Sequence, residues 1–142
     1  MLKRFFLSAV AAVFCFGLVK ADYPRPMESM SGLYGYANSV GQMVIKPRYD
    51  NALPFREGFA AVERRGKWGF IDLRGKVIAK LIYDSVKDFN YGFAIVQLNG
   101  KWGAIDTDGN LIVPCEHDTY GELENLKVVH LPDGGVQVTT GK

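Results

Sequence analysis

The sequence predicts an all-β protein, a short tandem array of about three 34-residue antiparallel β-meander units. From Tyr34 onward, glycines, aromatic residues and aspartates recur at a constant offset of 34 residues, which indicates a repeat architecture. The apolar runs between them are short and β-prone, as at positions 93–98, and such runs between turn signals indicate strands. Three units are fewer than the four or more blades of a closed propeller. We therefore expect an open repeat array or a small sandwich-like body.

The repeat period alone leaves a helical alternative open, because tetratricopeptide hairpins also repeat every 34 residues or so. Each unit, however, carries three or more glycines, and none contains twelve residues that are both free of glycine and proline and apolar at helical spacing. The composition therefore favours strands.

The segment before the array has the three parts of a secretory signal peptide. Positions 1–4 form a short basic segment that contains Lys3 and Arg4, and positions 5–19 form an apolar run. Val19-Lys20-Ala21 then provides a cleavage site after Ala21. The run is shorter than the ~20 residues of a membrane-spanning helix. We expect a cleaved signal helix at 1–21, a flexible leader at 22–32 that contains two prolines, and a β-repeat domain at 33–142. The mature protein would be periplasmic or extracellular, with no stable membrane span.

Loss of the signal also changes the charge and the cysteine content. The full chain has 17 basic and 15 acidic residues, and removing Lys3, Arg4 and Lys20 leaves 14 basic against 15 acidic, a formal net charge of −1. Bulk electrostatics then gives no attraction for nucleic acid. Cys15 lies in the signal, so Cys115 is left without a partner for an internal disulfide.

Each unit is expected to hold three strands joined by two kinds of turn. Asn99-Gly100 matches a two-residue type I′ hairpin turn, and Arg65-Gly66 holds the same place one unit earlier. The segments 72–75 and 106–109 begin with Asp and end with Gly, which matches a type I turn with a glycine bulge. A third strand would follow at 76–79 or 110–113, and a longer connection at 83–91 would lead to the next unit.

The type I′ turns also predict which residues face one another. The count from Arg65-Gly66 pairs Val62 with Gly69 and Ala60 with Ile71, while the count from Asn99-Gly100 pairs residues 97 and 102. Because side chains alternate between faces, Ala60, Val62 and Ile71 should form the core face. Trp68 and Phe70 should lie on the opposite face, which must be at least partly covered.

These residues resemble a known family. The segment GKWGFID at 66–72, the segment GKVI at 75–78 and the segment GFAIV at 92–96 resemble the WG repeat, a bacterial β-repeat named for its Trp-Gly pair. The resemblance gives units at about 34–67, 68–101 and 102–142, with Tyr34 in the first Trp position and the last unit degenerate. It implies a binding or scaffolding role, and it brings no catalytic residues.

The aromatic residues Tyr34, Trp68 and Trp102 share one repeat position. They could line a stripe that binds glycans or peptides. They could equally pack between successive units and cover sheet surface, and we favour this structural interpretation.

Cys115, His117 and Asp118 are the strongest candidates for a catalytic cluster in the sequence, since a Cys–His pair can generate a thiolate nucleophile. The equivalent positions in earlier units hold Pro47 and Leu81, then Tyr49 and Tyr83. We therefore favour a degenerate terminal unit over a catalytic site.

Two sets of residues resemble parts of metal sites. Asp106, Asp108 and Asn110 resemble the start of a calcium loop, but the glycine comes one position early and His117 stands where a bidentate Glu is required. An ordinary hairpin turn is the better interpretation. His117 and His130 are too few for zinc, which usually needs three or four protein ligands. Residues 128–139 are expected to form a last hairpin that caps the array.

We therefore predict a non-catalytic, secreted or periplasmic binding or scaffolding module of the cell envelope, with no cofactor and no metal. Its partner would be a protein or an envelope polymer. The alternatives are an envelope thiol enzyme or hydrolase that uses Cys115 and His117, and a structural subunit that oligomerises through unpaired edge strands.

Overall fold

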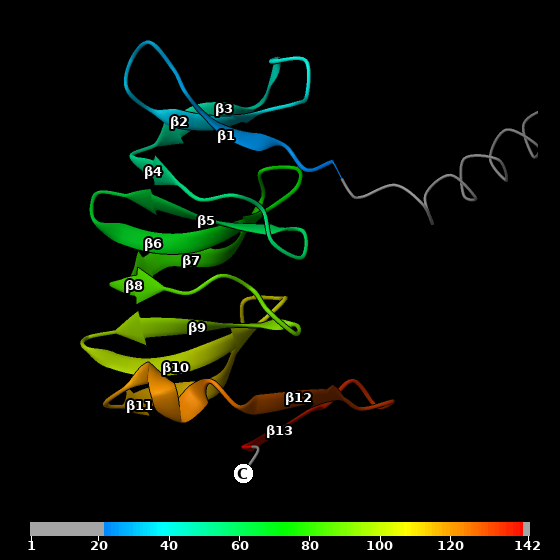
Figure 1. Ribbon diagram of the computed structural model, residues 1–142. Coiled ribbons are helices and arrows are strands. Elements are labelled where there is room, and N and C mark those ends of the chain that lie inside the picture. Colours follow the sequence, from blue (N-terminus) through cyan, green and yellow to red (C-terminus); the bar gives the residue numbers. More distant parts are fainter. Residues whose placement is uncertain (1–21, 141–142) are drawn as a thin grey trace, which may run out of the picture.

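The computed structural model describes residues 22–140, and the predicted signal helix lies outside them. Three antiparallel sheets are stacked in chain order, followed by a C-terminal hairpin (Figure 1). The first sheet contains β1 (Arg25–Glu28), β2 (Tyr34–Ala37) and β3 (Met43–Tyr49). The second contains β4 (Asn51–Ala52), β5 (Phe59–Arg64), β6 (Lys67–Asp72) and β7 (Val77–Tyr83). The third contains β8 (Ser85–Val86), β9 (Phe93–Leu98), β10 (Lys101–Asp106) and β11 (Leu111–His117).

The all-β open array is confirmed, and so are the predicted hairpin registers. Val62 faces Gly69 and Ala60 faces Ile71 across β5 and β6, and Gln97 faces Trp102 across β9 and β10. Both central residues of each predicted type I′ turn have positive φ, for example 52° at Asn99 and 79° at Gly100. This is the backbone that a two-residue hairpin between twisted strands requires.

Both faces of the second sheet are buried. Ala60, Val62 and Ile71 pack with Tyr36 and Phe55 between the first and second sheets, which confirms the predicted core face. The opposite face is also core, since Phe70 is 1% exposed and packs with residues of the third sheet such as Val96. The second sheet therefore lies between two neighbours, and this double burial is what makes the stack continuous.

Three sequence expectations were wrong. Residues 22–32 are not a flexible leader, because Arg25–Glu28 forms β1 and pairs with β2. It is an edge strand, where its proline is tolerated. The third strands extend to Tyr83 and His117 rather than ending at 79 and 113. The connection at 83–91 includes β8, so the second and third sheets have four strands each, and the first two strands of each lie in the preceding repeat unit.

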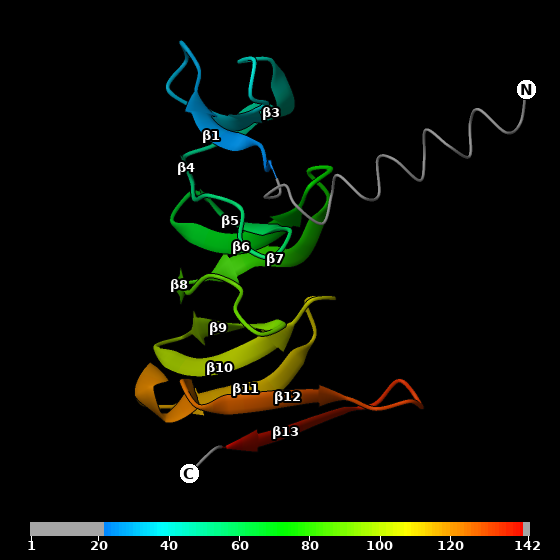
Figure 2. The same ribbon diagram turned by 45° about the vertical axis from the view of Figure 1, so that its right-hand side comes forward.

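The last hairpin, β12 (Leu126–His130) with β13 (Val136–Thr140), forms as expected. It follows a short 3₁₀ helix, η1 (Tyr120–Leu123). The capping of the third sheet comes mainly from Leu123 and Leu126, which pack against Phe93 and Ala104. Val128 and Val138 of the hairpin pack against the same core, and the turn end of the hairpin projects sideways from the stack (Figure 2). Within residues 22–140, no helix is long and apolar enough to cross a membrane.

Candidate binding surface

The predicted aromatic positions are half-buried and lie at the sheet surfaces. Trp68 packs beside the core between the second and third sheets, and Trp102 packs beside the core under η1. The Trp102 ring is 5.3 Å from the ring of Tyr120, edge to face. The hydroxyl of Tyr34 donates to Glu28 at 3.4 Å. Across residues 22–140, no aromatic pair joins any two of Tyr34, Trp68 and Trp102, so a ligand-binding stripe at these positions stays a prediction.

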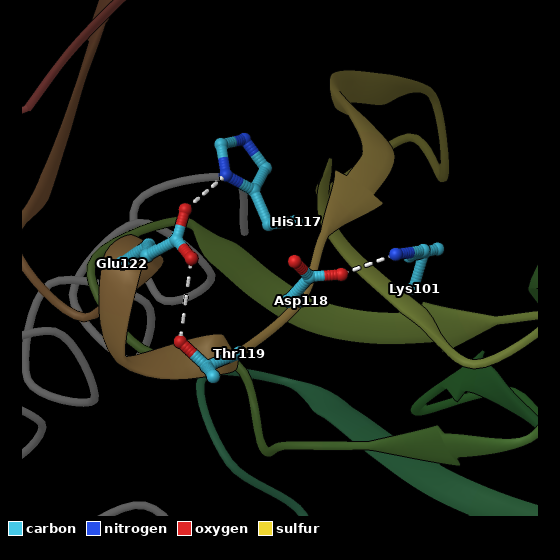
Figure 3. A network of polar contacts seen from close by, with 5 residues as sticks. All are labelled: Lys101, His117, Asp118, Thr119 and Glu122. Atoms are coloured by element: carbon cyan, nitrogen blue, oxygen red, sulfur yellow. Dashed lines mark hydrogen bonds and ion pairs between the residues drawn. The ribbon is translucent and has the colours of Figure 1, made fainter.

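His117 is paired with a carboxylate of the following 3₁₀ helix. His117 Nδ1 lies 2.7 Å from Oε2 of Glu122 in η1, and Asp118 forms an ion pair with Lys101 (Figure 3). Cys115 is partly buried beside the core of the second and third sheets. That burial raises the pKa of the Cys115 thiol, so the neutral thiol is favoured over the nucleophilic thiolate.

The Asp106 carboxylate accepts hydrogen bonds from backbone groups of the turn that it begins. Its Oδ1 accepts hydrogen bonds from the N–H groups of Asp108 and Asn110, both at 2.9 Å. Asp72 accepts from Arg74 and Lys76 in the same way one unit earlier. This confirms the ordinary hairpin turn, and no cluster of three His, Cys, Asp or Glu side chains suited to a metal occurs within residues 22–140.

Carboxylates also connect successive sheets, which the sequence analysis missed. Asp50, after β3, accepts a hydrogen bond at 2.7 Å from the N–H of Arg65 in the turn of the next sheet. Asp84, after β7, accepts from the N–H of Gly100 at 3.4 Å. The recurrence of Tyr-Asp at 49–50 and 83–84 was the available signal. It shows that the repeated aspartate holds the turn of the following unit.

Asp84 also forms an ion pair with a lysine side chain. Lys67 Nζ lies 2.6 Å from Asp84 Oδ1 and holds the pKa of that carboxyl below its ordinary value. The pair Lys101–Asp118 repeats the contact one unit later and lowers the pKa of Asp118 in the same way. Both pairs are exposed to solvent, so they contribute little to stability by themselves.

Glu57 makes the third contact between sheets. Its two carboxylate oxygens accept hydrogen bonds from the N–H groups of Tyr91 and Gly92, each at 2.9 Å. Tyr91 and Gly92 have positive φ, 53° and 81°, so they form a second type I′ turn in the third sheet, between Asn90 and Phe93. The matching turn in the second sheet is Glu57-Gly58 itself.

An open groove of about 580 Å³ runs beside these turns. It spans two repeats, and its lining residues are Tyr23, Phe55, Arg56, Glu57, Asp88, Phe89 and Asn90. The ring centroids of Tyr23 and Phe55 are 6.1 Å apart. Arg56 Nε lies 3.9 Å from Asp88 Oδ2, and both side chains are largely exposed. The groove therefore combines aromatic surface with one cation and two carboxylates, and we take it as the candidate binding surface.

Stacked sheets that each contact only their neighbours define a tandem β-repeat protein. The family model for the WG containing repeat matches residues 34–68, 68–102 and 102–125. The chain belongs to the WG repeat family. No curated protein and no solved structure gives a significant match to it.

Proposed function

We propose that this WG repeat protein is a secreted or periplasmic, non-catalytic binding or scaffolding module of the cell envelope, and that it binds a protein through the groove beside Arg56. The observation that carries the proposal is the composition of the groove, which takes residues from two successive repeats. Concave surfaces with aromatic lining and a few polar groups are the usual form of binding sites. The family match supports a repeat scaffold for such a surface.

The proposed location rests on the amino-terminal pattern of the sequence. A basic start, an apolar run at 5–19 and a cleavage site after Ala21 are typical of secretion. Fractionation of cells that express the full-length protein, with mass measurement of its amino terminus, tests this. A mature terminus at Asp22 in the periplasm or medium is expected, whereas an intact Met1 terminus in the cytoplasm would refute the proposed location.

A non-catalytic role is also supported by the surroundings of Cys115. A thiol enzyme needs a thiolate and a nearby base, whereas burial raises the pKa of Cys115 and His117 contacts Glu122. We therefore favour a binding module over a thiol enzyme or hydrolase.

The binding role is tested by cross-linking at the groove. A photo-reactive amino acid replaces Asn90, which lines the groove, or Asn110, which lies on a turn outside it. Each variant is illuminated in living cells, and adducts are identified by mass spectrometry. A defined protein adduct from position 90, absent from position 110 and lost on combining with Arg56→Glu, is expected. The same adducts from both positions would refute the groove as a binding surface.

A second candidate function, a structural subunit, is favoured by the edge strands. The edge strands β3, β7 and β11 begin at apolar residues that recur at the 34-residue offset. These residues, Met43, Val77 and Leu111, are 36%, 44% and 50% exposed. Strands at sheet edges carry unpaired backbone groups that can join another chain. Sedimentation at rising protein concentration tests this. Growth in mass that Val77→Lys abolishes is expected, and a monomer at all concentrations would refute it.

A further inference from the structure

We propose that the turn Glu57-Gly58 is a carboxylate-binding site, and that the carboxylate belongs to a partner polypeptide that lies in the groove. The inference rests on the proposed function, because Arg56 and Glu57 line that groove, and it specifies the chemistry of the ligand.

Four two-residue turns have positive φ at both positions. They are Glu57-Gly58, Arg65-Gly66, Tyr91-Gly92 and Asn99-Gly100. In such turns the two central N–H groups point away from the hairpin, and successive N–H groups of this kind form a concave site for anions. Three of the four hold a carboxylate from the same chain.

The three occupied turns follow one rule, since the carboxylate comes from the sheet before. Asp50 bonds to the turn at 65–66, Asp84 to the turn at 99–100, and Glu57 to the turn at 91–92. The fold therefore places a carboxylate on this kind of turn repeatedly, with N···O distances from 2.7 to 3.4 Å.

The turn Glu57-Gly58 breaks the rule because of one residue. The carboxylate for the 91–92 turn comes from a residue 34 positions before Tyr91. The residue 34 positions before Glu57 is Tyr23, which has no carboxylate and packs against Phe55 instead. Within residues 22–140, the N–H groups of Glu57 and Gly58 have no hydrogen-bond acceptor.

The turn is accessible from outside. Glu57 is exposed and Gly58 half-buried, and apart from its two chain neighbours no residue has an atom within 4 Å of the position that a Cβ on Gly58 would take. Arg56, next in the chain, is 68% exposed and can add a cation to the two N–H groups. Charge-assisted hydrogen bonds of this type are the stronger ones.

The surrounding charges favour a polypeptide over a free anion. Asp88 balances Arg56 at 3.9 Å, and Glu57 adds a further negative charge, so no strong positive field attracts small anions. A carboxylate needs further contacts to bind here, and the rings of Tyr23 and Phe55 offer apolar surface for the residues beside it. An Asp or Glu side chain, or a chain terminus, meets both requirements.

Amide NMR spectra of the protein, expressed from its full-length sequence, test the site directly. Three probe peptides are titrated: acetyl-Leu-Glu-Leu-amide, its Gln analogue acetyl-Leu-Gln-Leu-amide, and acetyl-Leu-Gln-Leu with a free carboxyl terminus. The Glu57 and Gly58 amide signals should shift downfield with a peptide that carries a carboxylate and stay in place with the uncharged one. A response to the first peptide alone assigns a side-chain carboxylate, and a response to the third assigns a terminus.

Three variants complete the test. Tyr23→Glu places a carboxylate at the repeat position equivalent to Glu57, so without peptide it should shift the same two amides and prevent further response to peptide. Tyr23→Phe is its matched control and should behave as the wild type. Arg56→Gln should raise the dissociation constant two- to fivefold, roughly what an exposed ion pair contributes, whereas Arg74→Gln, on a different turn, should leave it unchanged.

The proposal is overturned if the Glu57 and Gly58 amides ignore every carboxylate peptide, or respond equally to the uncharged one. It is also overturned if Tyr23→Glu, shown to be folded by its spectrum, leaves both amides in place. These results are separate from the cross-linking at Asn90. A groove adduct without an amide response refutes the carboxylate site and leaves the binding role standing.

Discussion

Replacing Gly69 with alanine would place a methyl group in the backbone of the neighbouring strand. A Cβ at position 69 would lie 2.5 Å from the carbonyl oxygen of Ala79 and 2.9 Å from the N and Cα atoms of Leu81. Favourable contacts to carbon lie at ~3.5–4.0 Å, so β7 would have to move by about 1 Å. The ladder between β6 and β7 is already irregular here, with a register shift between Trp68 and Phe70.

The cost of Gly69→Ala can be assembled from these contacts. Loss of about two ladder hydrogen bonds costs about 1 kcal/mol each, and overpacking strain adds about 1 kcal/mol or more. We expect a loss of about 3 kcal/mol in the free energy of unfolding, and a melting temperature about 10 °C lower for a domain of this size. Urea unfolding followed by tryptophan fluorescence and thermal unfolding followed by circular dichroism measure both.

Gly100→Ala is the matched control. Gly100 has a φ of 79° and open space around its Cα, so alanine there meets backbone strain of about 1–2 kcal/mol and no clash. The reasoning is refuted if Gly69→Ala is no more destabilising than Gly100→Ala, because close approach of the strands would then not be what requires the glycine of the Trp-Gly pair.

Three further predictions concern single side chains. Glu57→Gln should lower the free energy of unfolding by about 1 kcal/mol, because a neutral amide is a weaker acceptor for the turn N–H groups; equal urea midpoints would contradict this. Lys67→Met should raise the pKa of Asp84 in a carboxyl NMR titration, because Lys67 depresses it; the stabilisation from this pair is present above the unfolded-state pKa and is lost as pH falls through the lower folded-state pKa, so an unchanged Asp84 pKa would show that the pair does not form. Cys115 should react with a disulfide reagent more slowly than an exposed thiol, and the pH midpoint of its reaction rate should lie above that of free cysteine, because burial raises the pKa of the thiol. A fast reaction at neutral pH would instead support the thiol-enzyme alternative.

The sequence predicted those features of the fold that depend on local backbone chemistry. Asn99-Gly100 and Asp72 through Gly75 specify their turns by conformational preference, and the turns determine the register. The core face at Ala60, Val62 and Ile71 follows from that register by alternation alone. No long-range information was needed for any of these.

Features that depend on the neighbouring unit were missed. β4 and β8 have two residues each and exist only because they pair with β5 or β9, so no pattern of their own indicates a strand. β1 contains a proline, which is typical of a leader rather than a strand, yet β1 pairs with the free edge of β2. The acceptor role of Glu57 requires the turn of the next sheet, 34 residues away, and the candidate groove requires two repeats together.

The boundaries of the sequence repeats do not coincide with the boundaries of the sheets, so each repeat contributes strands to two successive sheets. The match to the family model at 34–68 begins in β2 of the first sheet and ends in β6 of the second. Each later sheet therefore takes its first two strands from the repeat before it, and carboxylates after β3 and β7 reach forward to the next turn. Because both covalent chain and hydrogen bonds cross each boundary, a sheet cannot leave the stack without breaking the edge of the next one. The groove beside Arg56 and Asp88 lies across such a boundary, so its geometry is held by the same contacts that hold the array together.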